Sequence, residues 1–501
     1  MSESPSVSPA TSATATATTG TGTGTAPPVG AAPPGRGPRL GAILAVSCVA
    51  QFMIVLDSTI VTVALPSMRT ALRLSAEQQQ WVVNAYLVAL GGLLLLAARV
   101  GDVAGHRRVF QAGLAVFTLA SLAGGLAAGG PMLITARVVQ GVGAAALGPS
   151  SLSLIATTHT EPGRRMKGLA LWSMMGGVAA AVGVVLGGVL TAELDWRWVL
   201  FVNVPIGAVL IVVGAVVLPR TPRRTDAQGP RLDLPGALLA TVAAAGLTFG
   251  FSRAPEDGWT SGQVLGPLIA APVLLAVFVL VETRSALPLV PPSFFRSRRL
   301  CVGNAVMLCV GATMTASLVL ITLYLQQCLG YSALRAGMAL VPMTIVLVVG
   351  TLLAKPLLPR FGPGPLLAGG GLIAAAGVAW MADLPTHSAY AAHVLGPTLV
   401  TALGISGMLL SVTVTATSGV HPRNAGSASG LLATSRQLGG ALGLAALTSV
   451  ADFATRSAAG ADAADPVAAM VHGYRIALLS NSGIMLLAVL ASLALLGKRQ
   501  A

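Results

Sequence analysis

Two charged residues lie inside long apolar segments of the sequence. Asp57 is the single charge of the segment Gly41–Pro66, and Arg137 lies about six residues into the segment 131–157. A charge at such a depth in a membrane is costly, and it is kept where it faces a polar cavity, pairs with an opposite charge or binds a proton. The two residues together predict proton-linked chemistry.

The expected depth of the two charges favours a pair. Nine residues separate Asp57 from Pro66, roughly 13 Å along a helix, which a short carboxylate does not bridge to water. Arg137 enters from the same membrane surface, so each residue is the expected partner of the other. The arginine favours a charged acid and burial favours a neutral one, so a site that opens alternately to the two sides would load and release a proton. A static ion pair that only fixes packing is the alternative.

The elements that carry these charges are helices in a membrane. The chain is 54% hydrophobic and only 9% charged, and fourteen apolar segments recur along it. Each segment is long enough for a helix to span a bilayer, and none alternates as the strand of a membrane barrel would. The predicted fold class is an all-α polytopic membrane protein. The segments lie at 41–66, 78–98, 108–128, 131–157, 168–191, 197–218, 234–252, 263–283, 301–325, 336–355, 365–383, 392–416, 430–451 and 476–496.

The basic residues indicate the orientation of these helices. With the N-terminus taken as cytoplasmic, 22 of the 30 Lys and Arg residues fall in segments on the cytoplasmic side and 7 on the other side. This asymmetry predicts that both termini are cytoplasmic. It also explains the net charge of +14 without a nucleic-acid partner. The four cysteines have no metal-ligand spacing, so neither a disulfide framework nor a metal site is predicted.

A weak internal repeat suggests two related halves. The segment 72–76 (LRLSA) matches 329–333 (LGYSA) at an offset of 257, and Gly105 falls on Gly362 at the same offset. Two six-helix halves favour alternating access around a site near the membrane midplane. Asp57 has no acidic counterpart at this offset, so the proton-linked chemistry is expected in the N-terminal half, and no other acid is expected deep in the C-terminal half.

The repeat and the composition together predict four parts of the chain. The first is rich in Ser, Thr, Ala, Gly and Pro, which predicts disorder. The parts are a disordered cytoplasmic tail (1–38), an N-terminal six-helix bundle (39–218), two inserted helices with cytoplasmic linkers (219–300) and a C-terminal six-helix bundle (301–501).

Three further groups of residues are candidates for function. In the loop between the second and third segments, Asp102, Gly105 and Arg107 form a turn that either serves conformational change or only anchors the helix ends. Glycines of the fifth segment, Gly183, Gly187 and Gly188, let another helix approach closely. Candidates for lining a substrate cavity, or for simple interhelical contacts, are Met53, Asn84, Tyr86, Asn304, Met314, Gln326 and Gln437.

These stretches resemble the major facilitator superfamily, in particular its fourteen-helix drug:proton antiporters. The resemblance runs from about residue 40 to the C-terminus, through LDSTIVTVALP (56–66), WVVNAYLVAL (81–90), GDVAGHRRVF (101–110), ARVVQGVGAA (136–145), DWRWVLFVNVPIG (195–207) and SRQLGGALG (435–443). It implies the major facilitator fold, with two six-helix halves and two inserted helices. The helix-4 motif of the family falls on Arg137, Gln140 and Gly141, and the resemblance implies that this arginine takes part in proton coupling.

The resemblance has departures that bear on transport direction. The antiporter motif of the fifth helix usually contains a proline where this chain has Val184, and the loop motif usually has arginine at Val103 and His106. The family's proline is thought to shape the helix for export. Import therefore stays open as an alternative to export.

The expected function is a proton-coupled antiporter that exports amphipathic drugs or antibiotics across the cytoplasmic membrane by alternating access. Its partners are a small amphipathic substrate, protons and the lipid bilayer; a monomer is expected, and no cofactor or metal. The alternatives are a proton-coupled importer of the same fold and a membrane-embedded enzyme. An enzyme would need a nucleophile–base set or metal ligands at membrane depth, and the six histidines fall in loops or at helix ends.

Overall fold

A computed structural model describes residues 40–159, 161–219, 233–285, 288–386, 390–418, 420, 425–461 and 465–496. In these residues the regular structure is helical and contains no strand, and fourteen helices are long and apolar enough to cross a membrane. The prediction of an all-α polytopic membrane protein with fourteen spans is confirmed. The predicted tail, residues 1–38, lies outside the described residues.

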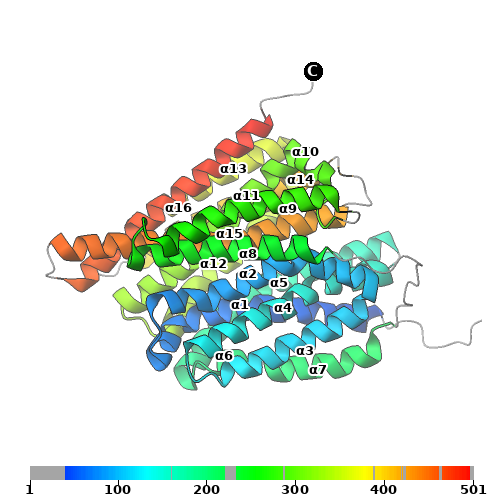
Figure 1. Ribbon diagram of the computed structural model, residues 1–501, viewed down its shortest axis with the longest axis horizontal. Coiled ribbons are helices and arrows are strands. Elements are labelled where there is room, and N and C mark those ends of the chain that lie inside the picture. Colours follow the sequence, from blue (N-terminus) through cyan, green and yellow to red (C-terminus); the bar gives the residue numbers. More distant parts are fainter. Residues whose placement is uncertain are drawn as a thin grey trace, which may run out of the picture. The chain divides into compact units, whose positions relative to one another are not determined.

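Figure 1 shows the arrangement of the helices in the described residues. The helices before residue 285 are α1 (Leu40–Leu72), α2 (Ala76–Ala104), α3 (His106–Gly125), α4 (Gly130–Thr158), α5 (Pro162–Glu193), α6 (Trp198–Phe201), α7 (Asn203–Val217), α8 (Leu234–Asp257) and α9 (Gly262–Arg284). The later ones are α10 (Pro292–Arg296), α11 (Arg298–Leu323), η1 (Tyr324–Cys328), α12 (Ala333–Phe361), α13 (Pro363–Met381), η2 (Ala391–Leu395), α14 (Gly396–Thr417), α15 (Ala425–Ala461) and α16 (Pro466–Leu496).

Two groups of helices pack mainly within themselves. In the N-terminal group, α1 to α7, the main contacts join α1 to α5, α2 to α4 and α3 to α4. In the C-terminal group, α11 to α16, they join α11 to α15, α13 to α14 and α13 to α16. The two groups meet where α5 packs on α12 and α2 on α15, and α8 contacts both α2 and α15.

Local features repeat at the offset of 257 residues. The hydroxyl of Ser75 caps α2 by accepting a hydrogen bond from Gln78 N, and that of Ser332 caps α12 by accepting one from Arg335 N. Such caps satisfy amide groups that the first helical turn leaves unpaired. Gly105 and Gly362 each end a helix with positive φ, 94° and 77°, a conformation that glycine adopts without strain. In both groups, therefore, a serine caps the start of a helix and a glycine ends a helix at matching positions.

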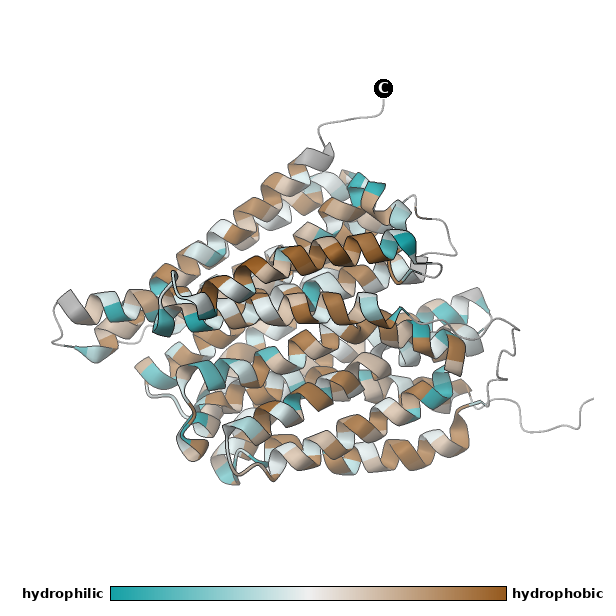
Figure 2. Cartoon of the chain, viewed as in Figure 1, coloured by the Kyte–Doolittle hydropathy of each residue, from teal (hydrophilic) through white to brown (hydrophobic). Residues whose placement is uncertain are grey.

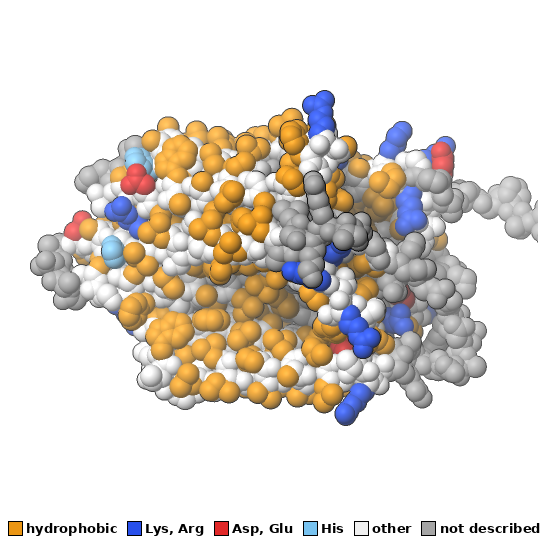
Figure 3. Space-filling model, turned by 90° about the horizontal axis from the view of Figure 1, so that it is seen from above, with side chains coloured by type: hydrophobic (Ala, Val, Ile, Leu, Met, Phe, Trp, Pro, Cys, Tyr) orange, Lys and Arg blue, Asp and Glu red, His pale blue; other side chains and the backbone are white. Residues whose placement is uncertain are grey.

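The outer surface of the helices is apolar. Figure 2 shows brown segments along the helices, with teal concentrated near their ends. In the face shown in Figure 3, orange side chains cover most of the described surface, and Lys and Arg gather toward its ends. Large apolar side chains such as Val216, Val212 and Leu119 are 78%, 66% and 65% exposed. A surface of this kind suits lipid contact, and the chain is a multi-pass membrane protein.

Two charged residues of α15 lie deeper in this helix than the sequence indicated. Arg436 lies well inside α15 and is partly buried, whereas the orientation predicted from the basic residues includes it among the 22 on the cytoplasmic side. Asp452 lies within the same membrane span, Ser427–Ala459, because the helix continues past the apolar run predicted to end at residue 451.

Candidate functional site

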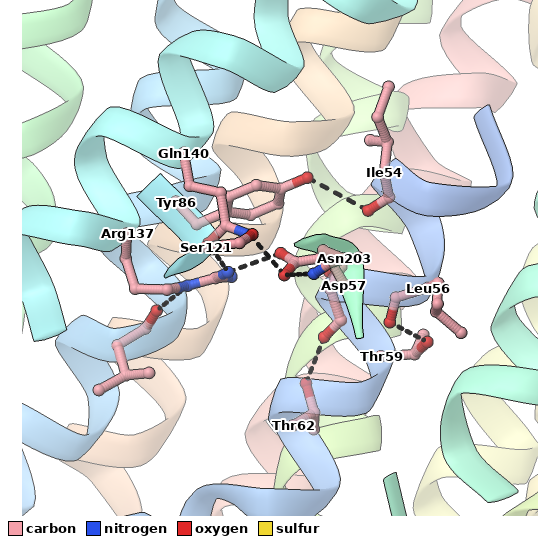
Figure 4. A network of polar contacts seen from close by, with 12 residues as sticks. Ile54, Leu56, Asp57, Thr59, Thr62, Tyr86, Ser121, Arg137, Gln140 and Asn203 are labelled. Atoms are coloured by element: carbon pink, nitrogen blue, oxygen red, sulfur yellow. Dashed lines mark hydrogen bonds and ion pairs between the residues drawn. The ribbon is translucent and has the colours of Figure 1, made fainter. Parts of the chain in front are cut away.

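The candidate site is an ion pair inside the N-terminal group (Figure 4). Nη1 of Arg137 on α4 lies 2.6 Å from Oδ2 of Asp57 on α1, and the side chains are 1% and 0% exposed. Both residues stand well inside their helices, because apolar runs extend on either side of each. A buried pair of this kind is stable only when its remaining polar atoms are also satisfied.

The second oxygen of Asp57 is held by two amides. Gln140 lies one turn after Arg137 on α4, and its Nε2 donates to Oδ1 of Asp57 at 2.7 Å and to Oγ of Ser121 at 2.6 Å. Nδ2 of Asn203 donates to the same Oδ1 at 3.0 Å. Asp57 thus receives hydrogen bonds from α4 and α7, and Ser121 links α3 to the network. Both oxygens of the carboxylate therefore accept hydrogen bonds from the protein, which favours its charged form.

The guanidinium of Arg137 is equally well supported. Its Nε donates to Val82 O at 3.0 Å, and its Nη1 also donates to Oε1 of Gln140 at 2.7 Å. The ring of Tyr86 lies against it, with Cζ of Arg137 4.3 Å from the ring centroid. A cation over an aromatic face gains electrostatic attraction, more so when it is buried. The Tyr86 hydroxyl donates to Ile54 O at 3.2 Å, which ties α2 to α1.

A break in a helix brings Asn203 to this network. The span Trp198–Val217 is divided at Val202 into α6 and α7, and Asn203 is the first residue of α7. Pro205, two residues later, has no amide hydrogen to continue the helical ladder, which favours such a break. Asn203 was part of the family-like stretch 195–207 but was not singled out from the sequence.

The network joins one carboxylate to donors on other helices. The charged form of Asp57 depends on Arg137 and on hydrogen bonds from two helices, α4 and α7, so a rearrangement of these helices changes the stability of that form. Protonation of Asp57 in turn removes one charge from the pair and weakens its hold on α4.

Gly141, in the turn that carries Gln140, allows α4 to lie close to α2. A methyl group added at Gly141 would lie 2.6 Å from Tyr86 O and 2.8 Å from Cβ of Ala89. In the same helix, a methyl group added at Gly148 would meet no atom within 4 Å. The absence of a side chain at position 141 thus allows α4 to lie against the backbone of α2 beside Tyr86.

Gly141→Ala is expected to destabilise the protein by about 1–3 kcal/mol, the usual cost of overpacking, whereas Gly148→Ala is expected to be neutral or slightly stabilising. The measurement is the midpoint of thermal unfolding in detergent, followed by tryptophan fluorescence. Equal midpoints for the two variants would contradict the close packing of α2 and α4.

The three glycines of α5 face two helices. A methyl group at Gly187 would lie 2.9 Å from Ile60 O, and one at Gly183 would lie 3.1 Å from Leu56 O, so both glycines lie against α1. One at Gly188 would lie 2.6 Å from Cα of Leu334, at the start of α12. Small residues therefore bring α5 close both to the helix that carries Asp57 and to the C-terminal group.

The residues of the loop motif between α2 and α3 contact different partners. Nη2 of Arg107 donates to Ala215 O in α7 at 2.5 Å. Oδ1 of Asp102, which is exposed, lies 3.5 Å from Nε2 of His106. Gly105 supplies the turn between the helices, as its φ of 94° requires. Arg107 thereby ties the start of α3 to α7.

The seven residues proposed to line a cavity are scattered through the two groups. Tyr86 belongs to the ion-pair network, Met53 is fully buried in the core of the N-terminal group, and Met314 packs at the edge of a core cluster of the C-terminal group. Two amide side chains of the set donate hydrogen bonds to the backbone. Nε2 of Gln326 donates to Val63 O at 2.9 Å, and Nδ2 of Asn304 donates to Leu300 O at 2.7 Å.

The two remaining members lie on facing helices. Asn84 on α2 is fully buried, and neither of its side-chain polar atoms has a partner among the described residues. Gln437 on α15 packs beside Gly91 of α2. They lie where the two helix groups meet.

A cavity of about 230 Å³ lies between the two groups and is lined by none of these seven residues. It is near the ends at which α1 leads into α2 and α15 leads into α16. Its polar lining includes Gln79, Gln80, Asp452 and Tyr474. Val83 of α2 also lines it, and Val82, the preceding residue, accepts the hydrogen bond from Arg137. The cavity and the ion pair are thus adjacent along one helix.

The family model and the similar proteins that match this chain point to one family. A model described as Major Facilitator Superfamily matches residues 47–444. The cephamycin export protein of Amycolatopsis lactamdurans is 44% identical over 82% of this chain and 85% of its own length. The puromycin resistance protein of Streptomyces alboniger is 40% identical over 94% of both chains.

A solved structure with the same fold is that of a bacterial homologue of the human lysosomal transporter Spinster, in an inward-facing and unoccupied conformation. It superposes with a TM-score of 0.64 at 19% sequence identity and covers 93% of this chain and all of its own. At this identity the likeness establishes the fold.

Proposed function

The chain belongs to the major facilitator superfamily, and from this premise we propose that it is a proton-coupled antiporter that exports amphipathic drugs or antibiotics by alternating access. Similar proteins named for cephamycin export, puromycin resistance, and tetracenomycin C resistance and export favour drug efflux. Because the similar proteins are named for export or resistance, transport is favoured over catalysis as the function of this chain. The proposed location is the cytoplasmic membrane, with both termini cytoplasmic and the protein a monomer.

The observation that carries the proposal is the buried ion pair. Asp57 and Arg137 are 2.6 Å apart and almost fully buried in a membrane protein, where an ion pair adds less to stability than apolar packing does. The energetic cost of burying these two charges is explained if the charge of the pair changes during the transport cycle. In the proposed cycle Asp57 accepts a proton, its attraction to Arg137 weakens, and the released contacts allow the helices to move.

The proton then leaves on the other side. When the site faces the opposite side, the pair re-forms, the guanidinium favours the carboxylate, and Asp57 gives up its proton. Substrate binding in the space between the helix groups would be linked to these steps through α2, which contacts both the pair and the cavity. The division into bundles 39–218 and 301–501, with 219–300 inserted, is part of this proposal.

Proton-driven uptake into everted membrane vesicles tests the function. Acidifying the lumen is expected to drive uptake of amphipathic dyes such as ethidium, rhodamine 6G and Nile red above the rate in vesicles from the same host without the protein. Collapse of the gradient by a protonophore should stop it. Dye movement out of the lumen under the same gradient would favour the importer, and no response to any dye would contradict proton-coupled transport.

A further inference from the structure

Asn203 is a buried amide that uses only one of its two polar ends. Its side chain is 0% exposed, and its Nδ2 donates to Oδ1 of Asp57 at 3.0 Å. Its own Oδ1 is buried and accepts no hydrogen bond from the described residues. Buried polar atoms are normally paired, because an unpaired one keeps the cost of leaving water. Asn203 therefore has an acceptor that the charged form of Asp57 leaves unused.

Protonation changes what Asp57 needs from its neighbours. A carboxylate only accepts hydrogen bonds, whereas a carboxylic acid also donates one. Oδ2 of Asp57 lies 2.6 Å from Nη1 of Arg137, so a proton there would face a positively charged donor. Oδ1 faces two amide donors, Gln140 Nε2 at 2.7 Å and Asn203 Nδ2 at 3.0 Å. A proton on Oδ1 is paired only if one of these amides turns its oxygen toward Asp57.

Gln140 is fixed by its other contacts. Its Oε1 accepts from Nη1 of Arg137 at 2.7 Å, and its Nε2 also donates to Oγ of Ser121 at 2.6 Å. A half turn of this amide would bring its donor against the guanidinium, which has no acceptor. Asn203 makes no second side-chain hydrogen bond with the described residues. Its amide can therefore turn about one side-chain bond and exchange Nδ2 for Oδ1 without losing any other contact.

The other polar groups near Asp57 do not supply this acceptor. Arg137 of α4 can only donate, and the hydroxyl of Tyr86 on α2 donates to a backbone carbonyl of α1. Ser121 of α3 contacts Gln140 rather than Asp57. In the described part of the chain, no hydrogen bond or ion pair joins Asp57 to α5, α6, α11 or α12. Asn203 is left as the acceptor within reach.

We propose that Asn203 is a positioning residue for the proton on Asp57, and that its amide turns when Asp57 changes form. With Asp57 charged, Nδ2 of Asn203 donates to the carboxylate. When a proton from the aqueous side binds Oδ1 of Asp57, the carboxylic acid donates its O–H to Oδ1 of Asn203. The acid then has a partner in either form, which lowers the cost of each in the apolar interior. This inference rests on the proposed proton-coupled function and adds a residue to its proton site.

Infrared difference spectra of the purified protein in lipid, acidic minus neutral pH, test the turn directly. The protein is made with asparagine that carries carbon-13 in its side-chain carbonyl, so that asparagine bands move and those of glutamine and the backbone do not. Acidification should produce the carbonyl band of a carboxylic acid together with a change in an asparagine carbonyl band, because that oxygen begins to accept a hydrogen bond. An acid band from Asp57 with no asparagine change would overturn the proposal.

Three variants assign these bands. Asp57→Asn should remove both changes, and Asn203→Leu, which has a similar size and no polar side-chain atom, should remove the asparagine change. Asn481→Leu is the matched control. Asn481 is also 0% exposed, donates one hydrogen bond to Oγ of Ser317 at 3.0 Å, and has an Oδ1 without a partner in the described residues. It should keep both changes, and an asparagine change that is lost in this control or kept in Asn203→Leu would contradict the assignment.

The assignment does not depend on the folding of Asn203→Leu. An asparagine change that is lost in Asp57→Asn and kept in Asn481→Leu belongs to an asparagine that contacts Asp57, which is Asn203. Where Asn203→Leu folds, its proton-driven dye uptake in everted vesicles is expected to fall at least about tenfold, because the protonated acid keeps a buried O–H without a partner. Uptake at the wild-type rate would count against the proposal.

The spectra also separate this inference from the proposed function. If the wild-type protein shows no acid band that depends on Asp57 at any pH at which it stays folded, Asp57 carries no proton, and the proposed coupling fails together with this inference. If the acid band appears and the asparagine bands do not change, proton binding at Asp57 stands, and only the role of Asn203 is wrong.

Discussion

Asp57→Asn is expected to abolish proton-driven dye uptake in everted vesicles, so that the rate falls to that of vesicles without the protein. Asparagine has nearly the same shape, and its single amide oxygen can replace one of the two carboxylate oxygens, either the one that accepts from Arg137 or the one that accepts from Gln140. It cannot be charged and discharged by a proton. The helices should therefore still assemble, because the packing is kept, while the step that uses the gradient is lost.

The fold of this variant is checked separately from its transport. The amount of protein in the membrane and a single symmetrical peak in size-exclusion chromatography should match the wild type. Some loss of thermal stability is expected, because Arg137 then remains buried without its counter-ion. A folded Asp57→Asn protein that still follows the proton gradient at the wild-type rate would remove Asp57 from the proton pathway.

Arg137→Ala is expected to abolish transport as well and to destabilise the protein more than Asp57→Asn does. The substitution removes the donor to Val82 O, the contact with the Tyr86 ring and the ion pair together. Removal of one partner of a buried pair typically costs about 3–5 kcal/mol. Arg137→Lys keeps the charge but loses the planar, multiply donating group, so intermediate transport is expected. Dye uptake and the unfolding midpoint are measured for both variants.

A double variant separates a working pair from a static one. Asp57→Asn/Arg137→Gln removes both charges and leaves no ion unpaired. Its loss of unfolding free energy should therefore be smaller than the sum of the losses in the two single variants. If the pair only fixes packing, transport should return in the double variant. If the pair carries the proton, transport should remain absent while the stability recovers.

Much of the site was visible in the sequence because charges stand out in apolar segments. Asp57 and Arg137 were identifiable in this way, and their expected proximity followed from the depth at which each enters the membrane. The resemblance added Gln140, whose amide bridges Asp57 and Ser121. The glycine spacing of α5 likewise predicted close packing, since glycine positions define the smooth face of a helix.

Other parts depended on three-dimensional packing that no local pattern records. Asn203 reaches Asp57 across a separation of 146 residues, at a helix break whose only visible trace is Pro205. From the sequence, Tyr86 is a candidate for a cavity wall or for an interhelical contact, and in the structure its ring lies against Arg137. Gln79 and Asp452 lie near the ends of apolar segments, where polar residues usually face water, so the sequence did not distinguish a cavity wall from a loop.

The most direct test of the central claim is proton movement driven by substrate in proteoliposomes. Vesicles that contain the purified protein and an internal pH indicator receive an ethidium gradient, with the membrane potential clamped by potassium and valinomycin. The account predicts proton flux opposite to the dye in the wild type and none in Asp57→Asn. Dye movement without proton flux in the wild type, or equal proton flux in both proteins, would contradict it.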